Sequence, residues 1–306
     1  MKNTLIVLPG PTGVGKTEFA TDLAGRLGCS IISCDSRQFY REMKIGTAMP
    51  DDEQLARVKH HFIGFLSVTN YYSISLFERD VLTLLPSLFA VNPVAVMTGG
   101  SMLYMDAVCR GMDDIPDTDP AVRQKYLELY QTEGIAGLRM ALKMLDPDHY
   151  ARVDLHNPRR IMRALEITES TGRPYSSFLT APTREREFRI IKAGLTRERD
   201  ELHRRIDNRV DSMLEKGLEA EAASLTRYRG LNALNTVGYR EMFSLFDGLI
   251  TREQAVGLIK RNTRRYARKQ LTWWRRDSEI TWFDASDGER IRSWIETRLE
   301  ESQARG

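Results

Sequence analysis

The residues best suited to bind a phosphate lie near the start of the chain, in the segment TLIVLPGPTGVGKT at positions 4–17. After an apolar run, Gly10, Gly15, Lys16 and Thr17 satisfy the pattern G-x-x-x-x-G-K-[ST] of a phosphate-binding loop. The glycines permit backbone conformations in which successive amides point at an oxyanion, and the helix that follows adds its positive end. Lys16 is expected to reach the outer phosphate, and the Thr17 hydroxyl to ligate Mg²⁺. The predicted diphosphate ligands are Gly10, Pro11, Thr12, Gly13, Val14, Gly15, Lys16 and Thr17.

A carboxylate, Asp35, follows the end of a second predicted strand and is the candidate general base. Residues 30–34 form a short apolar strand that ends directly at Asp35. Ligands of an open α/β sheet bind outside the carboxyl ends of its strands, so we expect Asp35 beside the phosphate loop. A helix N-cap explains the position of this residue equally well.

The end of a later strand, at residues 93–98, lacks the acid with which ATPases and GTPases of this class normally hold Mg²⁺. Thr98, Gly99, Gly100 and Ser101 stand there instead, so hydroxyls replace the carboxylate and the glycines allow a ligand to approach closely. The sequence therefore offers hydrogen-bond donors for a phosphate and one carboxylate placed as a base. This combination suits transfer of a group to a second substrate better than nucleotide hydrolysis.

Apolar periodicity predicts an α/β fold with a parallel sheet of the P-loop NTPase type flanked by helices. Strands are predicted at residues 5–8, 30–34, 93–98, 187–194 and 280–283. Helices are predicted at residues 17–28, 75–89, from 102, 157–171, 196–216 and 251–276. In the helix at 196–216, Arg205 and Arg209 share a face that can point back at the ligand end of the sheet.

The segment after Gly111 predicts a helical insertion into this fold. Residues 112–120 are acidic and contain prolines, which is typical of a linker, and residues 121 to about 180 show helices without a strand signal. The helix at 157–171, with Asn157 as its expected N-cap, presents Arg159, Arg160 and Arg163, which either face solvent or contact a nucleic acid. The predicted domains are a core made of residues 1–115 and 185–306 and a helical insertion at residues 116–184.

Composition limits the class of protein. The chain has 306 residues, of which 42% are hydrophobic and 28% charged, so it can bury a sizeable core. The three cysteines form no C-x-x-C pair, which indicates a reducing compartment and no structural zinc. His60 and His61 are expected as core or pocket residues in a connecting stretch, because no second cluster of metal ligands accompanies them. Without a signal peptide or an apolar span, we expect a cytoplasmic monomer with no membrane association.

The positive charge of the chain is concentrated in its C-terminal part. The net charge is only +3, but residues 260–276 hold eight Lys and Arg residues and no acid. On the helix predicted there, Ile259, Tyr266 and Trp273 fall on one side. The cationic side holds Arg261, Arg264, Arg265, Arg268 and Arg275. A cationic face without acidic partners on its own helix favours a polyanionic ligand over simple exposure to solvent.

These motifs, found in order along nearly the whole chain, resemble bacterial tRNA dimethylallyltransferases. They are GPTGVGKT (10–17), DSRQFYREMKIGTAMP (35–50), Tyr72 and Ser73 with Phe77, TGGSMLY (98–104), DPAVR (119–123), NPRRIMRALE (157–166), GLTRERDELHRRIDNRV (194–210), VGYRE (237–241) and ARKQLTWWRR (267–276). The resemblance implies Mg²⁺-dependent transfer of a dimethylallyl group from dimethylallyl diphosphate to tRNA. The acceptor would be the exocyclic amine of the adenosine 3′ to the anticodon, in the anticodon stem-loop, and diphosphate would be released.

The resemblance also implies roles for individual residues. Asp35 corresponds to the general base, Lys16 and Arg209 to diphosphate ligands, and Ser101 to a hydroxyl on the bridging oxygen of the leaving group, where the family commonly has Thr. Residues expected to contact tRNA are Asp35, Ser36, Arg37, Gln38, Ser101, Arg123, Arg159, Arg160, Ile161, Met162, Arg163, Thr236, Val237, Gly238, Tyr239 and Arg240, together with Arg261, Arg264 and Arg268 of the basic helix.

Other functions remain open from the sequence. An adenylate isopentenyltransferase would share the loop and the base but act on free AMP or ADP, and the basic C-terminal helix argues against it. A small-molecule kinase of the P-loop class would need the absent strand-end acid. A non-catalytic RNA-binding module, or a chance match to the loop pattern, would leave residues 10–17 without a role.

Overall fold

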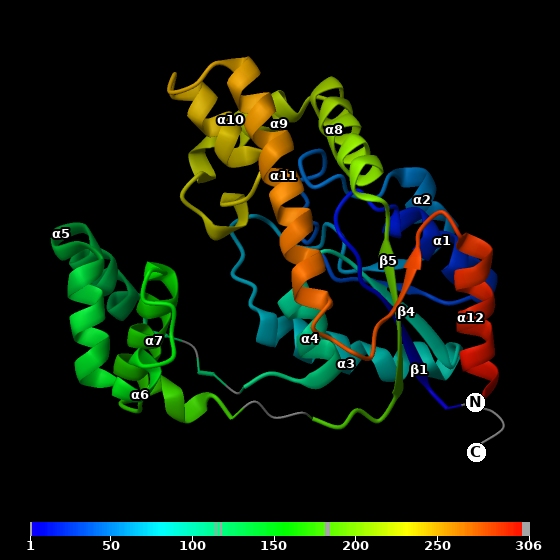
Figure 1. Cartoon of the computed structure of the whole chain (residues 1–306), viewed down its shortest axis with the longest axis horizontal. Coiled ribbons are helices and arrows are strands. Elements are labelled where there is room, and N and C mark those ends of the chain that lie inside the picture. The colour runs from blue at the N-terminus through cyan, green and yellow to red at the C-terminus, as the bar shows by residue number, and fades with distance from the viewer. Residues whose placement is uncertain (1, 114, 117, 181–183, 302–306) are drawn as a thin grey trace. The chain divides into compact units, whose positions relative to one another are not determined.

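The computed structural model describes residues 2–113, 115–116, 118–180 and 184–301. Its centre is a sheet of six strands in the order β3-β2-β4-β1-β5-β6, with parallel pairing throughout (Figure 1). The strands are β1 (Thr4–Leu8), β2 (Ile31–Ser33), β3 (His60–His61), β4 (Val94–Thr98), β5 (Arg189–Thr196) and β6 (Thr281–Asp284). This confirms the predicted fold class.

Five of the strands were predicted and are confirmed, whereas β3 was not predicted. It consists only of the half-buried His60 and His61, and it pairs with β2 at the edge of the sheet. Two polar residues carry no apolar alternation, so the segment has no strand signal in the sequence. Burial lowers the pKa of both histidines.

The helices follow the apolar pattern closely. They are α1 (Lys16–Leu27), α2 (Asp52–Arg57), α3 (Ile74–Val91), α4 (Met102–Arg110), α5 (Pro120–Leu145), α6 (Pro147–Tyr150), α7 (Pro158–Thr171), α8 (Arg199–Glu215), α9 (Leu218–Ser224), α10 (Tyr239–Phe246), α11 (Arg252–Trp274) and α12 (Gly288–Glu301). Short 3-10 helices span Tyr175–Phe178, Thr226–Tyr228 and Asn232–Leu234.

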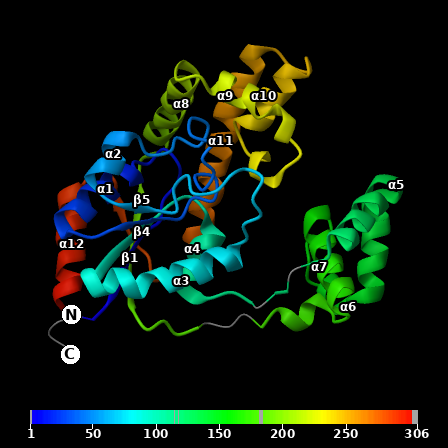
Figure 2. The same cartoon turned by 180° about the vertical axis from the view of Figure 1, so that it is seen from behind.

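Both faces of the sheet are buried, because side chains of β1 alternate between two apolar cores. Ile6 and Leu8 pack with residues of α1 and α12 on one face. Leu5 and Val7 pack with residues of α3 and α4 on the other (Figures 1 and 2). The first core is held at its edge by an ion pair of 2.9 Å between Asp22 of α1 and Arg292 of α12.

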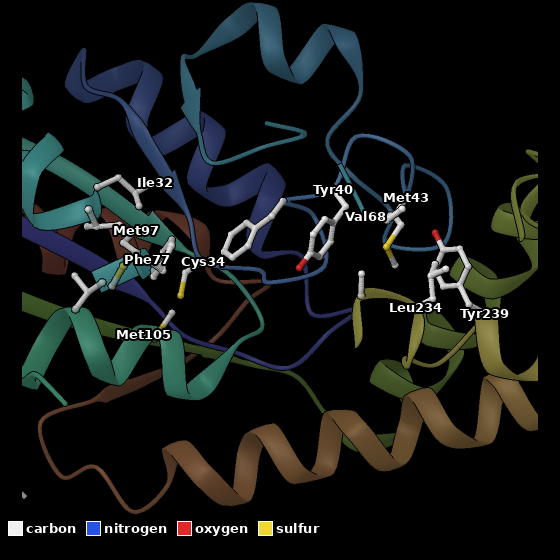
Figure 3. Close-up of a cluster of buried hydrophobic side chains, with 14 of the residues drawn as sticks. Ile32, Cys34, Tyr40, Met43, Val68, Phe77, Met97, Met105, Leu234 and Tyr239 are labelled. Carbon is white, nitrogen blue, oxygen red and sulfur yellow. The ribbon is translucent and has the colours of Figure 1, made fainter. Parts of the chain in front are cut away.

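The second core continues beyond the sheet into the helices α9, α10 and α11. Figure 3 shows Cys34, Phe77 and Met105 near the strands, followed by Tyr40 and Met43 and then by residues of the helical part. Glu221 of α9 accepts hydrogen bonds from the amides of Ile45 and Gly46 at 2.7 and 2.8 Å. The helical part is therefore joined to the loop that follows β2.

Residues 110–184 form a separate compact unit, and residues 1–109 and 185–306 form the other. The unit has its own apolar core, built from α5 and α7 and including Leu138, Leu142 and Leu165. Asn157 caps α7 by accepting from the amide of Arg160, as predicted. Gly134 has a positive φ of 65° and interrupts α5. Residues 114 and 117 of the predicted linker lie outside the described residues.

In the part of the chain that the structure describes, no helix combines the length and the apolar character that crossing a membrane requires.

Candidate active site

The register of the sheet brings three predicted segments to one edge. Leu8 of β1 pairs with Thr98 of β4, and Thr98 also pairs with Ser33 of β2. The phosphate loop, the TGGS segment at 98–101 and Asp35 directly follow these three strand ends. They therefore leave the sheet side by side, which is where ligands of open α/β sheets bind.

The phosphate loop exposes its amides and ties down its carbonyl groups. Within the described residues, the amides of Gly13, Gly15, Lys16 and Thr17 have no hydrogen-bond acceptor. Gly13 and Gly15 have φ values of 82° and 107°, which side chains disfavour. Unpaired amides at the N-terminus of α1 form a site for an anion.

Two arginines hold the outer side of this loop. Arg197, just after β5, donates from Nε to the carbonyl oxygen of Val14 at 2.9 Å. Arg205 of α8 donates from Nε to the carbonyl oxygen of Gly13, also at 2.9 Å. These bonds fix the loop conformation from outside and place two positive charges next to it.

Lys16, Arg209 and Asp35 lie within electrostatic range of one another. The Lys16 Nζ donates to the carbonyl oxygens of Gly10 and Pro11 at 2.6 and 2.9 Å. Burial, opposed by Asp35 and assisted by Arg209, lowers the pKa of Lys16 to about 7. Burial also lowers the pKa of Arg209, again opposed by Asp35. Two buried cations beside one carboxylate leave a net positive charge, which a bound anion would neutralise.

Asp35 has one carboxylate oxygen in use and one available. Its Oδ1 accepts from the amide of Arg37 at 3.1 Å, and its carbonyl oxygen accepts from the amide of Gln38, so Asp35 opens a turn and not a helix. The N-cap interpretation is therefore wrong. No donor among the described residues reaches Oδ2, which lies 3.2 Å from the point where a Cβ on Gly100 would stand.

The hydroxyl of Ser101 holds the chain next to Asp35. Its Oγ accepts from the amide of Ser36 at 2.8 Å and lies 2.9 Å from the Ser36 Oγ. A Cβ on Gly99 would stand 2.0 Å from the carbonyl oxygen of Cys34, so only glycine fits where β4 passes the end of β2.

Further polar contacts secure the segment after Asp35. Arg37 donates to the carbonyl oxygens of Asn232 and Ala233, and Gln38 donates to those of Thr47 and Ala48. The Thr47 oxygen also accepts from the Arg209 Nη2 at 3.2 Å. Arg209 thus joins the loop after β2 to α8 as well as facing Lys16.

Sequence reasoning did not single out Gln270 and Tyr266 of α11 as site residues. The Gln270 Oε1 accepts from the amide of Thr12 at 2.8 Å, and its Nε2 donates to the carbonyl oxygen of Gly100 at 2.8 Å. The Tyr266 hydroxyl donates to the same Gly100 oxygen at 3.0 Å. The available signals were their spacing of four on one helix face and the position of Gln270 within the motif ARKQLTWWRR.

Part of the cationic side of α11 has acidic partners on a neighbouring helix, which the sequence of α11 could not show. Arg264 pairs with Asp207, and Lys260 pairs with Asp211 at 2.6 Å, both on α8. Leu271, on the same side, packs into the first core. The acids that neutralise Lys260 and Arg264 lie on α8, so the sequence of α11 alone gives no sign of them. Arg261, Arg265 and Arg268 are exposed and have no acidic partner among the described residues.

Burial also removes the Tyr239 side chain from the expected RNA-binding set. Tyr239 is 0% exposed, and its hydroxyl donates to Glu221 at 2.6 Å, so this side chain supports the core. Gly238 beside it is buried, Thr236 and Val237 are half-buried, and Arg240 is exposed.

In the insertion unit, Ile161 is 0% exposed within the local core, and Met162 packs against that core. The Ile161 side chain is therefore unavailable to a ligand, whereas Met162 is half-buried. Arg123, Arg159 and Arg160 are exposed, whereas Arg163 is half-buried and donates to the Thr118 hydroxyl at 3.3 Å.

Comparison with known proteins agrees with this geometry. The family model described as IPP transferase matches residues 38–277. A tRNA dimethylallyltransferase 2 of Porphyromonas gingivalis is 57% identical over 92% of this chain and 94% of its own length. The corresponding enzyme of Parabacteroides distasonis is 54% identical over 94% and 97%. The crystal structure of a full-length tRNA isopentenylpyrophosphate transferase from Bacillus halodurans is similar with a TM-score of 0.72 and 35% identity, over 99% of both chains. This chain therefore belongs to the IPP transferase family.

Proposed function

We propose that this protein transfers a dimethylallyl group from dimethylallyl diphosphate to the exocyclic amine of the adenosine 3′ to the anticodon in tRNA, releasing diphosphate. The main support is the Oδ2 of Asp35, which has no donor among the described residues, beside a phosphate loop with Lys16 and Arg209. A carboxylate oxygen next to a loop suited to diphosphate supports a role for Asp35 as the proton acceptor. The curated relatives, which are named tRNA dimethylallyltransferases, give the proposal its two substrates.

In the proposed reaction, the adenine nitrogen attacks the allylic carbon while the bond from that carbon to the diphosphate oxygen breaks. The bonding electrons leave with the diphosphate, and the amine proton goes to Asp35. An aromatic amine becomes acidic only as the new carbon–nitrogen bond forms, so the carboxylate acts as a base late in the step.

Cations of the loop would stabilise the charge that develops on the leaving diphosphate. Two of the three N–H donors of Lys16 bind Gly10 and Pro11, which leaves one for a phosphate oxygen. Ser101 is a less direct candidate for contact with the leaving diphosphate, because its hydroxyl already contacts Ser36. To donate to the bridging oxygen it would have to exchange the Ser36 hydroxyl for the ligand.

Mg²⁺ fits a site in which the substrate supplies most of the ligands. In the described parts of the chain, no group of three or more His, Cys, Asp or Glu side chains could hold a metal ion. The Thr17 hydroxyl, in the first turn of α1, would bind the ion together with diphosphate oxygens and water, as Mg²⁺ prefers. When bound, the ion would neutralise charge on the diphosphate.

tRNA would bind through exposed cations of both units. In the core these are Arg240 and the exposed arginines of α11, and in the insertion unit Arg123, Arg159 and Arg160. Such contacts with phosphates supply affinity and salt dependence without reading bases. The segment Asp35 to Gln38, beside the phosphate loop, would contact the reacting nucleotide.

A transfer assay tests the proposal. With Mg²⁺, labelled dimethylallyl diphosphate and unmodified tRNA, the label should appear in the RNA. The Asp35→Asn variant keeps an oxygen for the Arg37 amide but lacks a base, so we expect kcat to fall by about 10²- to 10⁴-fold. Binding of inorganic diphosphate should persist, because the loop contacts do not involve Asp35, and any change in affinity should reflect the lost charge near Lys16 and Arg209.

Two outcomes would contradict these assignments. Label appearing in AMP and not in tRNA would identify the protein as an enzyme of free nucleotides. Unchanged turnover by Asp35→Asn would exclude this carboxylate as the base.

A further inference from the structure

Gln270 links two parts of the site that lie far apart in the sequence. It stands on α11, and its side chain joins the amide of Thr12 in the phosphate loop to the carbonyl oxygen of Gly100, which follows β4. Both bonds measure 2.8 Å, and Gln270 is 0% exposed. A buried amide with both ends bonded has one orientation, because turning it over would face donor to donor and acceptor to acceptor.

The surroundings leave this side chain no room to move. A Cβ on Gly100 would stand 2.8 Å from the Gln270 Nε2 and 3.2 Å from the Asp35 Oδ2. The Gly100 backbone is thus packed between the amide of Gln270 and the candidate base. Tyr266, one turn earlier on α11, donates to the same Gly100 oxygen at 3.0 Å.

We propose that Gln270 is a positioning residue, which sets the distance between the diphosphate-binding loop and the strand end that carries the base. This inference rests on the proposed function of the site. The bond to Thr12 acts on the loop that would hold the leaving group. The bond to Gly100 acts on the backbone in contact with Asp35 and next to Ser101.

Positioning of this kind has a large effect on transfer chemistry. The reacting atoms must meet within a few tenths of an ångström, and a displacement of about 1 Å can cost about 10²-fold in rate. Gln270 itself touches neither reacting group, so its loss should change geometry without removing any chemical participant. Because α11 also carries Arg261, Arg265 and Arg268, the helix proposed to bind tRNA fixes the phosphate loop as well.

The test compares Gln270→Met with Tyr266→Phe. Methionine keeps the approximate length and volume of glutamine but makes neither hydrogen bond. We expect KM for dimethylallyl diphosphate and Kd for inorganic diphosphate to rise about tenfold, and kcat to fall at least about tenfold. KM for tRNA should not change. Tyr266→Phe removes one bond to Gly100 but keeps the Thr12 bond, so its affinity for diphosphate should stay within about twofold of wild type.

A folded Gln270→Met protein that binds diphosphate and transfers the prenyl group as well as wild type would overturn the proposal. A lower melting temperature with unchanged kinetics would also overturn it, because it would show a purely structural role. Failure of the wild-type protein to transfer the group would instead count against the proposed function.

Hydrogen exchange of the wild-type protein covers the case in which the variant does not fold. The Thr12 amide donates to Gln270, whereas the neighbouring Gly13 amide has no acceptor among the described residues. In the protein without ligand, Thr12 should exchange at least about tenfold more slowly than Gly13. Equal exchange rates would show that Gln270 does not hold the loop, and would overturn the proposal.

Discussion

At the scale of single residues, the site depends on Lys16, whose charged form is unfavourable when no anion is bound. Lys16 is enclosed by the carbonyl oxygens of its own loop and faces Arg209, and burial lowers its pKa to about 7. In the protein alone, a substantial fraction of Lys16 is therefore neutral near pH 7. An anion in the loop favours the ammonium form, so binding of diphosphate takes up a proton when the pH lies above this pKa.

The affinity for inorganic diphosphate should consequently fall as the pH rises above about 7, approaching about tenfold per pH unit from this group alone. Ionisation of diphosphate itself acts in the opposite direction. The Lys16→Arg variant is the control, because arginine stays charged while the ligand ionises identically. Calorimetry between about pH 6.5 and 8.5, in buffers of different ionisation enthalpy, measures the proton uptake. Parallel pH profiles of the two proteins would contradict this role of Lys16.

At the scale of elements, α11 packs on both cores and serves the site with the residues between them. Ile259 and Trp274 contribute to the core that continues into the helical part, and Ala267 to the core on the other face. Between these contacts lie Gln270 and Tyr266, which bond the loop segments. Among its cations, Lys260 and Arg264 pair with α8 and Arg252 with α9, whereas Arg261, Arg265, Arg268 and Lys269 are exposed.

This division predicts which arginines bind RNA. Replacing Arg261, Arg265 and Arg268 together with glutamine should weaken tRNA binding. It should also reduce the slope of log K against log salt by about 0.7 to 0.9 for each phosphate that the variant no longer neutralises. Arg264→Gln is the matched control, because it breaks the pair with Asp207 and should change that slope little. Binding titrations at several salt concentrations measure both. An unaltered slope in the triple variant would mean that this face meets only solvent.

At the scale of the whole molecule, the chain forms two units with independent apolar cores. No residue of 110–184 belongs to either core of the sheet unit, as far as the described residues show, and the core of the insertion contains only its own residues. The amide of Arg184 donates to the carbonyl oxygen of Arg110 at 2.8 Å. The two crossings, where the chain enters and leaves the insertion, therefore lie next to each other. We propose that the insertion contributes part of the tRNA-binding surface, whereas the chemistry takes place on the other unit.

Replacing residues 111–183 with a short glycine linker should therefore leave the sheet unit folded. The crossings are already adjacent, so closing them costs little loop entropy. The affinity for inorganic diphosphate should stay within about twofold, while kcat/KM for tRNA should fall at least about tenfold because the variant lacks the exposed arginines of the insertion. Calorimetry and the transfer assay measure the two quantities. Loss of diphosphate binding, or full activity on tRNA, would contradict this separation.

Much of the fold followed from local sequence, because a buried parallel strand is an apolar run and a helix repeats its apolar face. The strands β1, β2, β4, β5 and β6 and the helices α1, α3, α4, α7, α8 and α11 carry such patterns and were predicted within a few residues, whereas α12 was not predicted. The edge strand β3 has only His60 and His61 and was missed. The amphipathic α7 was predicted with its cap, but the burial of Ile161 depended on the rest of its unit.

By itself, the sequence determined the phosphate loop, the strand-end carboxylate and the missing second acid, since each is a property of residues adjacent in the chain. Only the tertiary structure decided how these parts are held together. The bonds of Gln270 to Thr12 and Gly100 span 258 and 170 positions, and those of Arg197 and Arg205 to the loop span 183 and 192. No local pattern encodes such contacts, because they depend on which faces meet after the sheet and α11 have packed. For the same reason, the sequence could count the cations of α11, and only the packing against α8 showed which of them remain available to a ligand.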